Sequence, residues 1–158
     1  MVGDWDGNGT YTAGGVRGKT WYLRNSNNSG AANVTFAYGS ASDIVVAGDW
    51  DGNRTTTPGV IRGAARYLRN SNTSGVANLT HIGRAADRHL VGDWDGDGTV
   101  TAGVVRDGTW YLRNAHSSGS ADMSFPYGDP GDLALATPRR SPATVVAGRS
   151  RPLAPATT

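Results

Sequence analysis

One pentapeptide, Gly-Asp-Trp-Asp-Gly, occurs three times in this chain, beginning at Gly3, Gly48 and Gly92. The copies stand 45 and 44 residues apart. Each is followed by a Val-containing segment that ends in Arg, a Gly-containing turn and the tetrapeptide Tyr-Leu-Arg-Asn. A fixed period of this length is typical of proteins built from identical structural units. The chain must therefore fold in a way that places similar units beside one another.

The residue types within each copy predict strands and turns. All 13 acidic residues are Asp, Gln is absent, and Gly accounts for 23 of the 158 residues, so good helix formers are scarce. Each copy has four short runs of β-branched and aromatic residues between turn formers. Four strands in about 45 residues is the size of a β-propeller blade. We predict an all-β fold of three four-stranded blades in an open or partial propeller; a two-layer sandwich is the alternative.

The period divides the chain into three blades and a tail: residues 1–47, 48–91, 92–136 and 137–158. The basic, Pro-rich and Ala-rich tail is expected to be disordered. Propellers close with about four to eight blades. We therefore expect the three blades to belong to a longer propeller or to self-associate as a homo-oligomer. The strand at residues 132–136 could pair with the first blade, whose own first strand is short, in the same chain or in a second copy.

The aromatic residues are predicted to form the core. Strand alternation puts Trp21 and Leu23 on one face of a strand, and Trp110 repeats Trp21, whereas Arg66 takes this place in the second copy. The Trp of each Asp-Trp-Asp is expected to pack between blades. The arginines of the three Tyr-Leu-Arg-Asn tetrapeptides are expected on a solvated face or in a salt bridge to a neighbouring blade. These arginines are Arg24, Arg69 and Arg113.

Charge and composition exclude several classes of function. The sequence pI is about 9.2, but four of the 15 cationic residues lie in the tail, and residues 1–132 carry 11 cations and 13 Asp, a net charge of −2. The blades are therefore not predicted to bind nucleic acid. Without Cys, disulfides and thiolate metal sites are excluded, and no window approaches the ~18 apolar residues of a membrane span.

No catalytic constellation is evident. His81, His89 and His116 fall at irregular places and none belongs to a nucleophile motif. Paired Asp residues recur in every copy, whereas a catalytic pair is needed once. We therefore do not expect an enzyme.

The best-preserved copy resembles a known family. The Asp-Trp-Asp-Gly-Asp-Gly-Thr of residues 93–99, followed by the segments 103–105 and 110–114, is similar to the FG-GAP or VCBS-type repeats of extracellular bacterial proteins, which are relatives of the integrin α propeller. The resemblance covers roughly residues 2–136. It implies that the Asp-rich loop of each blade binds calcium, and that the propeller serves as an adhesion, scaffold or accessory domain.

The Asp-rich loops can be compared with calcium chemistry directly. A calcium ion takes six to eight oxygen ligands, and an EF-hand-like loop supplies them from positions 1, 3, 5 and 7, with Gly at position 6. The second copy has Arg54 at this position, where a positive φ is expected, and is the poorest match. The candidate ligands are Asp93, Asp95, Asp97 and Thr99 in the third copy, Asp4, Asp6, Asn8 and Thr10 in the first, and Asp49, Asp51 and Asn53 in the second.

All three loops lack ligands that would make binding strong. Position 9, where the family usually has Asp, holds Thr12, Thr57 and Thr101, and no copy has a Glu at position 12. Any calcium affinity should therefore lie in the weak extracellular range, about 10⁻⁴ to 10⁻³ M. The same Asp and Asn side chains would also suit Asx turns that pin the loop without an ion.

Together these features predict an extracellular, non-enzymatic repeat module that binds protein or glycan or acts as a scaffold, with weak calcium as its cofactor. The chain itself shows no signal peptide. The alternative is an ancillary domain of a secreted hydrolase that acts on polysaccharide or peptide, with the catalytic domain elsewhere. Neither nucleic acid nor membrane is expected as a partner.

Overall fold

Each repeat forms one four-stranded antiparallel sheet in the computed structural model, which describes residues 1–84, 87–136 and 145–147. The first sheet contains β1 (Val2–Gly3), β2 (Thr12–Arg17), β3 (Thr20–Leu23) and β4 (Val34–Ala37). The second contains β5 (Ile44–Gly48), β6 (Thr57–Arg62), β7 (Ala65–Leu68) and β8 (Leu79–Ile82). The third contains β9 (Arg88–Gly92), β10 (Thr101–Arg106), β11 (Thr109–Leu112) and β12 (Met123–Pro126).

The predicted all-β class and the four strands in each repeat are confirmed. Within every sheet the strands lie in chain order and neighbouring strands are antiparallel. Among the described residues, no helix is long and apolar enough to cross a membrane.

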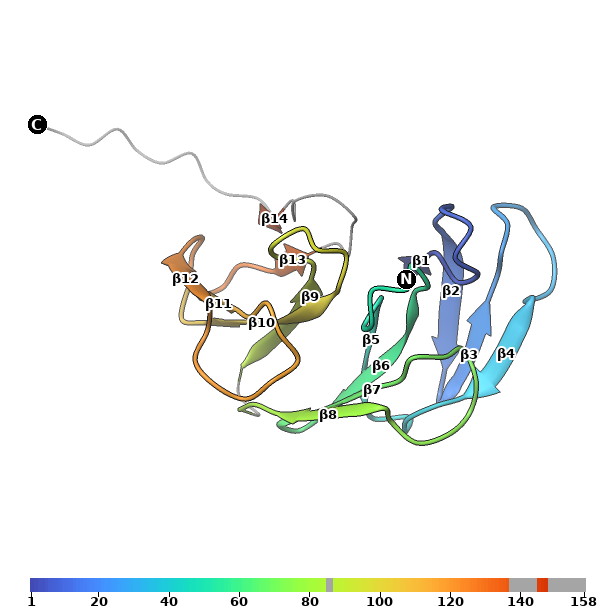
Figure 1. Ribbon diagram of the computed structural model, residues 1–158, viewed down its shortest axis with the longest axis horizontal. Helices are drawn as coiled ribbons and strands as arrows, with labels where there is room; N and C mark the ends of the chain where they lie inside the picture. Colours follow the sequence, from blue (N-terminus) through green and yellow to red (C-terminus); the bar gives the residue numbers. More distant parts are fainter. Residues whose placement is uncertain (85–86, 137–144, 148–158) are drawn as a thin grey trace, which may run out of the picture.

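The three sheets stand side by side in an open arc (Figure 1). The first strand of each sheet lies toward the middle of the arc and the fourth strand lies at its periphery, as β5 and β8 show in the second sheet (Figure 1). The first strands β5 and β9 contact each other directly. The arc does not close on itself.

The segment after the third sheet does not make the pairing that was predicted within one chain. Strand β13 (Ala134–Ala136) does not pair with the first repeat; it pairs with β14 (Val145–Ala147) and lies against β9. Strand β9 is the first strand of the third sheet and contacts β5, the first strand of the second sheet. Strand β13 lies next to β9 and so extends this row of first strands. Strand β14 is also an exception to the disorder predicted for the tail, while residues 137–144 and 148–158 lie outside the described residues.

The Trp of each Asp-Trp-Asp folds back over its own sheet. In the first repeat the indole Nε1 of Trp5 donates to the carbonyl oxygen of Thr12 at 3.1 Å, and a Cβ added at Gly14 would lie 2.6 Å from the indole ring. Only Gly leaves room for this contact. The equivalent tryptophans, Trp50 and Trp94, donate in the same way to Pro58 and Ala102.

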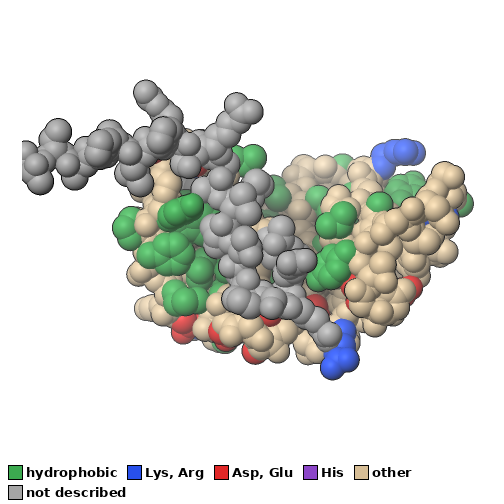
Figure 2. Space-filling model, turned by 90° about the horizontal axis from the view of Figure 1, so that it is seen from above, with side chains coloured by type: hydrophobic (Ala, Val, Ile, Leu, Met, Phe, Trp, Pro, Cys, Tyr) green, Lys and Arg blue, Asp and Glu red, His purple; other side chains and the backbone are tan. Residues whose placement is uncertain are grey.

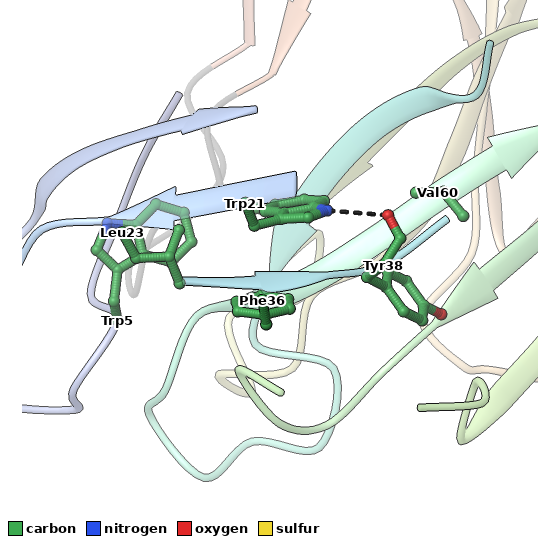
Figure 3. Packing of buried hydrophobic residues seen from close by; sticks show 7 residues of the cluster. Trp5, Trp21, Leu23, Phe36, Tyr38 and Val60 are labelled. Atoms are coloured by element: carbon green, nitrogen blue, oxygen red, sulfur yellow. Dashed lines mark hydrogen bonds between the residues drawn. The ribbon is translucent and has the colours of Figure 1, made fainter. Parts of the chain in front are cut away.

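The core joins neighbouring repeats. Trp21 is fully buried, stacks on Phe36 with the ring centroids 6.0 Å apart, and donates from Nε1 to the carbonyl oxygen of Tyr38 at 3.2 Å (Figure 3). Val60, from the second sheet, belongs to the same cluster (Figure 3). The predicted packing of Trp between repeats is seen where Trp50 meets Val100 of the third repeat.

Backbone hydrogen bonds repeat at both junctions between sheets. The amide of Thr56 donates to the carbonyl oxygen of Asp4 at 2.7 Å, and the amide of Val100 donates to Asp49 at the same distance. The Asn72 amide group also spans the first junction, donating to the carbonyl oxygens of Trp5 and Thr56. The same backbone hydrogen bond therefore joins successive sheets at both junctions.

The prediction for the repeated arginines was wrong. Among the residues that the structure describes, Arg24, Arg69 and Arg113 form no salt bridge to a neighbouring repeat, and each is half-buried rather than freely solvated. Each curls under the loop that follows it and donates to that loop's own backbone carbonyls, such as Asn28, Thr73 and Ser120. A guanidinium has five N–H donors, so one side chain can satisfy several carbonyls of a loop that has no ladder partner.

Candidate metal-binding loops

The three Asp-rich loops join the first two strands of each sheet and share one hydrogen-bonding scheme. In the third loop Asp93 is 1% exposed, and its two carboxylate oxygens accept from the amides of Gly96 and Gly98 at 2.8 and 3.1 Å. Asp95 accepts from the amide of Asp97, and Asp97 accepts from the amide of Thr99 at 2.6 Å. The bonds of Asp95 and Asp97, each from the amide two residues on, are the Asx turns that the sequence offered as the alternative to metal binding.

The first loop follows the same scheme with one carboxylate fewer. Asp4 is buried and accepts from the amide of Gly9 at 2.8 Å, while Asn8 replaces the third Asp and accepts from Thr10 at the same distance. Asp6 is exposed and accepts from both the amide and the side chain of Asn8. The other Asp4 oxygen, Oδ1, is buried and has no hydrogen-bond partner in the described part of the chain.

The second loop adopts the same turn although it lacks the expected Gly. Arg54 has a φ of 80°, close to the 91° and 95° of Gly9 and Gly98, so the position does need a positive φ, at a cost of about 1 to 2 kcal/mol for a residue with a Cβ. Its amide donates to Asp49 at 2.6 Å. Burial raises the pKa of Asp49 above its usual range, against the opposing effect of these amide hydrogen bonds. Asp51 and Asn53 accept from the amides of Asn53 and Thr55.

The threonines at position 9 of the loops have a different role from that of a ligand. Thr12, Thr57 and Thr101 are each 2% exposed. The hydroxyl of Thr57 donates to the carbonyl oxygen of Gly48, which ends the preceding strand, at 3.2 Å. The hydroxyls of Thr12 and Thr101 lie closer to the carbonyl oxygens of Arg24 and Arg113, at 2.5 Å, than to the glycine carbonyl of the preceding strand, at 3.4 and 3.3 Å. These hydroxyls hold the strands of one sheet together, so the position has a structural role.

The third loop is the one whose donor set suits a cation best. Single carboxylate oxygens of Asp93, Asp95 and Asp97 lie within 4.8 Å of one another, and Asp95 and Asp97 are exposed. Carboxylate oxygens are the ligands that calcium prefers. Three carboxylates supply fewer than the six to eight oxygens it needs, so water and carbonyl groups would have to complete the shell. The donor set therefore fits weak binding.

No family model, curated protein or solved structure matches this chain. The resemblance to the FG-GAP or VCBS-type repeats consequently stays a prediction from the motifs.

Sequence reasoning did not foresee a second polar site between the second and third sheets. A cavity of about 500 Å³ lies there, and Arg66, His81 and His116 are among its lining residues. The sequence does show that the second copy differs from the other two at Arg66 and at His81. A difference in residue type does not by itself predict a cavity, however.

Replacement of Asp93 by Ala should destabilise the third repeat. The change removes a buried acceptor and leaves the amides of Gly96 and Gly98 without their partner, so we expect the free energy of unfolding to fall by about 1 to 3 kcal/mol. Urea denaturation followed by tryptophan fluorescence measures the loss. Asp95→Ala is the matched control, since this exposed side chain accepts a single long bond of 3.3 Å, and equal losses for the two variants would contradict the assignment.

Proposed function

We propose that this chain is an extracellular, non-enzymatic module of β-propeller blades that presents its loops to a protein or glycan. The observation that carries the proposal is the interface that recurs between successive repeats, with the same pair of backbone groups hydrogen-bonded at 2.7 Å each time. Units that dock by one repeated interface form a regular array. Such an array holds equivalent loops at fixed spacing, which suits multivalent recognition.

An exposed apolar region supports a binding role. Hydrophobic side chains gather on the side of the molecule where the third sheet lies (Figure 2). Phe125, Tyr127 and Leu133 are 36, 50 and 68% exposed. Exposed apolar clusters on soluble proteins often mark interaction sites, and further blades or a second copy of the chain would suit this edge.

A glycan array combined with a panel of polysaccharide and peptide hydrolase assays tests the proposal. We expect binding of a protein or glycan ligand without turnover. Turnover by the purified chain would contradict the non-enzymatic assignment. Sedimentation tests the arrangement, since a stable and well-folded monomer of three blades would count against self-association.

As part of this function, the third Asp-rich loop is proposed to bind calcium weakly. With a dissociation constant of about 10⁻⁴ to 10⁻³ M, about 10 mM calcium should raise the free energy of unfolding by about 1.4 to 2.7 kcal/mol. The rise in melting temperature, measured with magnesium at the same concentration as a reference, checks this. The double variant D95N/D97N should lose the effect, whereas Asp51→Asn in the second loop should keep it. An unchanged melting temperature in calcium would contradict the proposal.

A further inference from the structure

The cavity between the second and third sheets exists because three residues differ from the first repeat. Between the first and second sheets, the corresponding space is filled by Trp21, Phe36 and Tyr38, which pack with Val60. In the second repeat the same register positions hold Arg66 and His81, which face each other across β7 and β8. Gly83 stands where the first repeat has Tyr38, with its amide bonded to Ala64 as that of Tyr38 is to Lys19. Smaller and polar side chains thus replace an aromatic cluster.

Arg66 is a buried cation that forms no ion pair with any carboxylate of the described residues. Its side chain is one of the cavity's walls, yet the residue is only 6% exposed. Its one hydrogen bond joins Nη2 to Nδ1 of His89 at 2.8 Å, and its Nε is buried with no partner in the described residues. A guanidinium stays charged in proteins, and a buried charge normally requires a counter-charge. The positive charge of Arg66 is therefore uncompensated, and an anion bound in the cavity would neutralise it.

The carboxylate that lines the same cavity, Asp87, is paired with another arginine. Asp87 receives two hydrogen bonds of 2.8 Å from Arg106, one from Nε and one from Nη2. This bidentate pair holds the pKa of Asp87 below its usual range. Arg106 and Asp87 line the cavity together with Arg84 and Arg113. Four arginines against one aspartate leave the walls strongly positive.

Two imidazoles complete the polar wall. His81 and His116 stack with their ring centroids 5.4 Å apart, and the Nε2 atom of each is buried without a partner in the described residues. Burial and a neighbouring cationic or imidazole group lower the pKa of both below the usual value. A neutral imidazole carries a single N–H, so a ring that holds this proton on its unpartnered Nε2 can donate to a ligand in the cavity.

We propose that this cavity binds an oxyanion of the sulfate or carboxylate type, with the Arg66 guanidinium as its principal partner. The forked donors of a guanidinium match the paired oxygens of both groups. A volume of about 500 Å³ accommodates a small ligand or one charged sugar residue. The site uses none of the Asp-rich loops, so it is independent of the proposed calcium binding.

Titration calorimetry of the whole chain with sodium sulfate, and separately with sodium acetate, at constant ionic strength tests the site. We expect saturable binding of at least one of the two anions, and comparison of the two distinguishes tetrahedral from planar oxyanions. A charge-assisted hydrogen bond contributes about 1.5 to 3 kcal/mol, so loss of Arg66 should weaken the affinity about tenfold to a hundredfold.

Two variants introduce the residues that the first repeat has at the equivalent positions, so we expect both to fold. Arg66→Trp removes the cation and should weaken the affinity about tenfold to a hundredfold. Gly83→Tyr fills the cavity while it keeps the cation, and it should abolish saturable binding. Arg17→Gln is the control, because Arg17 is exposed in the first sheet and lies over Tyr22, yet its loss changes the net charge by the same amount. The absence of saturable binding of either anion, or unchanged affinity in both Arg66→Trp and Gly83→Tyr, would overturn the proposal.

Discussion

Replacement of Trp21 by Ala should lower the free energy of unfolding by about 3 to 5 kcal/mol, the cost usual for deletion of a large buried aromatic ring. Trp21 has no exposed surface and contacts Phe36 by stacking. Its loss also leaves the carbonyl oxygen of Tyr38 without its donor. Because Val60 of the second sheet belongs to the same cluster, we expect the junction between the first two repeats to loosen along with the first sheet.

Urea denaturation followed by circular dichroism measures this loss. Trp21→Phe is the matched control, because it keeps the ring against Phe36 and removes only the indole N–H and part of the volume, so its loss should be clearly smaller. Hydrogen exchange should show faster exchange in both β3 and β6 of the Ala variant. A loss below about 1 kcal/mol would mean that this face is not part of the cooperative core.

Replacement of Arg66 by Trp should have the opposite effect and stabilise the chain. Substitution of well-packed apolar residues for buried ionic groups is often stabilising, by about 1 to 4 kcal/mol. The new indole would lie opposite His81, as Trp21 lies opposite Phe36. Burial already lowers the pKa of Arg66, which is consistent with a charge that is poorly solvated where it stands.

The midpoint of urea unfolding at pH 7, without added sulfate, measures this gain. Arg66→Met separates the loss of the buried charge from the packing of a new ring, since it removes the charge but supplies no ring. It should raise the midpoint by less than Arg66→Trp does. High sulfate should reduce the difference between the parent chain and the Trp variant, because an anion that binds the folded state of the parent stabilises it alone. A lower midpoint in Arg66→Trp would show that the guanidinium is better satisfied than its contacts indicate.

Much of each repeat followed from local patterns. The alternation that placed Trp21 and Leu23 on one face is confirmed by their complete burial, because a strand has a period of two whatever its surroundings. The positive φ expected at Arg54 is also confirmed, since turn geometry is set by a few adjacent residues. The propeller, by contrast, is a statement about how sheets are arranged, and it stays a proposal.

The predictions that were wrong concern side chains and strands whose partners lie far away in the sequence or in flexible loops. Arg24 has a long side chain with many rotamers, and its choice of the loop carbonyls of residues 28–31 over a neighbouring Asp depends on where that loop lies. Strand β13 was predicted to pair with the first repeat because the first strand there is short, but within one chain it lies against β9 instead. Neither outcome follows from spacing along the chain.

The sequence by itself determined the period, the four strands of each repeat, the Asx-rich loops and the buried aromatic positions, because all of these depend on neighbours within a few residues or on a repeated pattern. Only the tertiary structure decided which surfaces meet between repeats, that the loop carboxylates are engaged by backbone amides, and that Arg66, His81 and Gly83 open a cationic cavity. A cavity is the space left between two sheets. Its existence depends on the packed volumes of residues far apart in the chain, which no local pattern encodes.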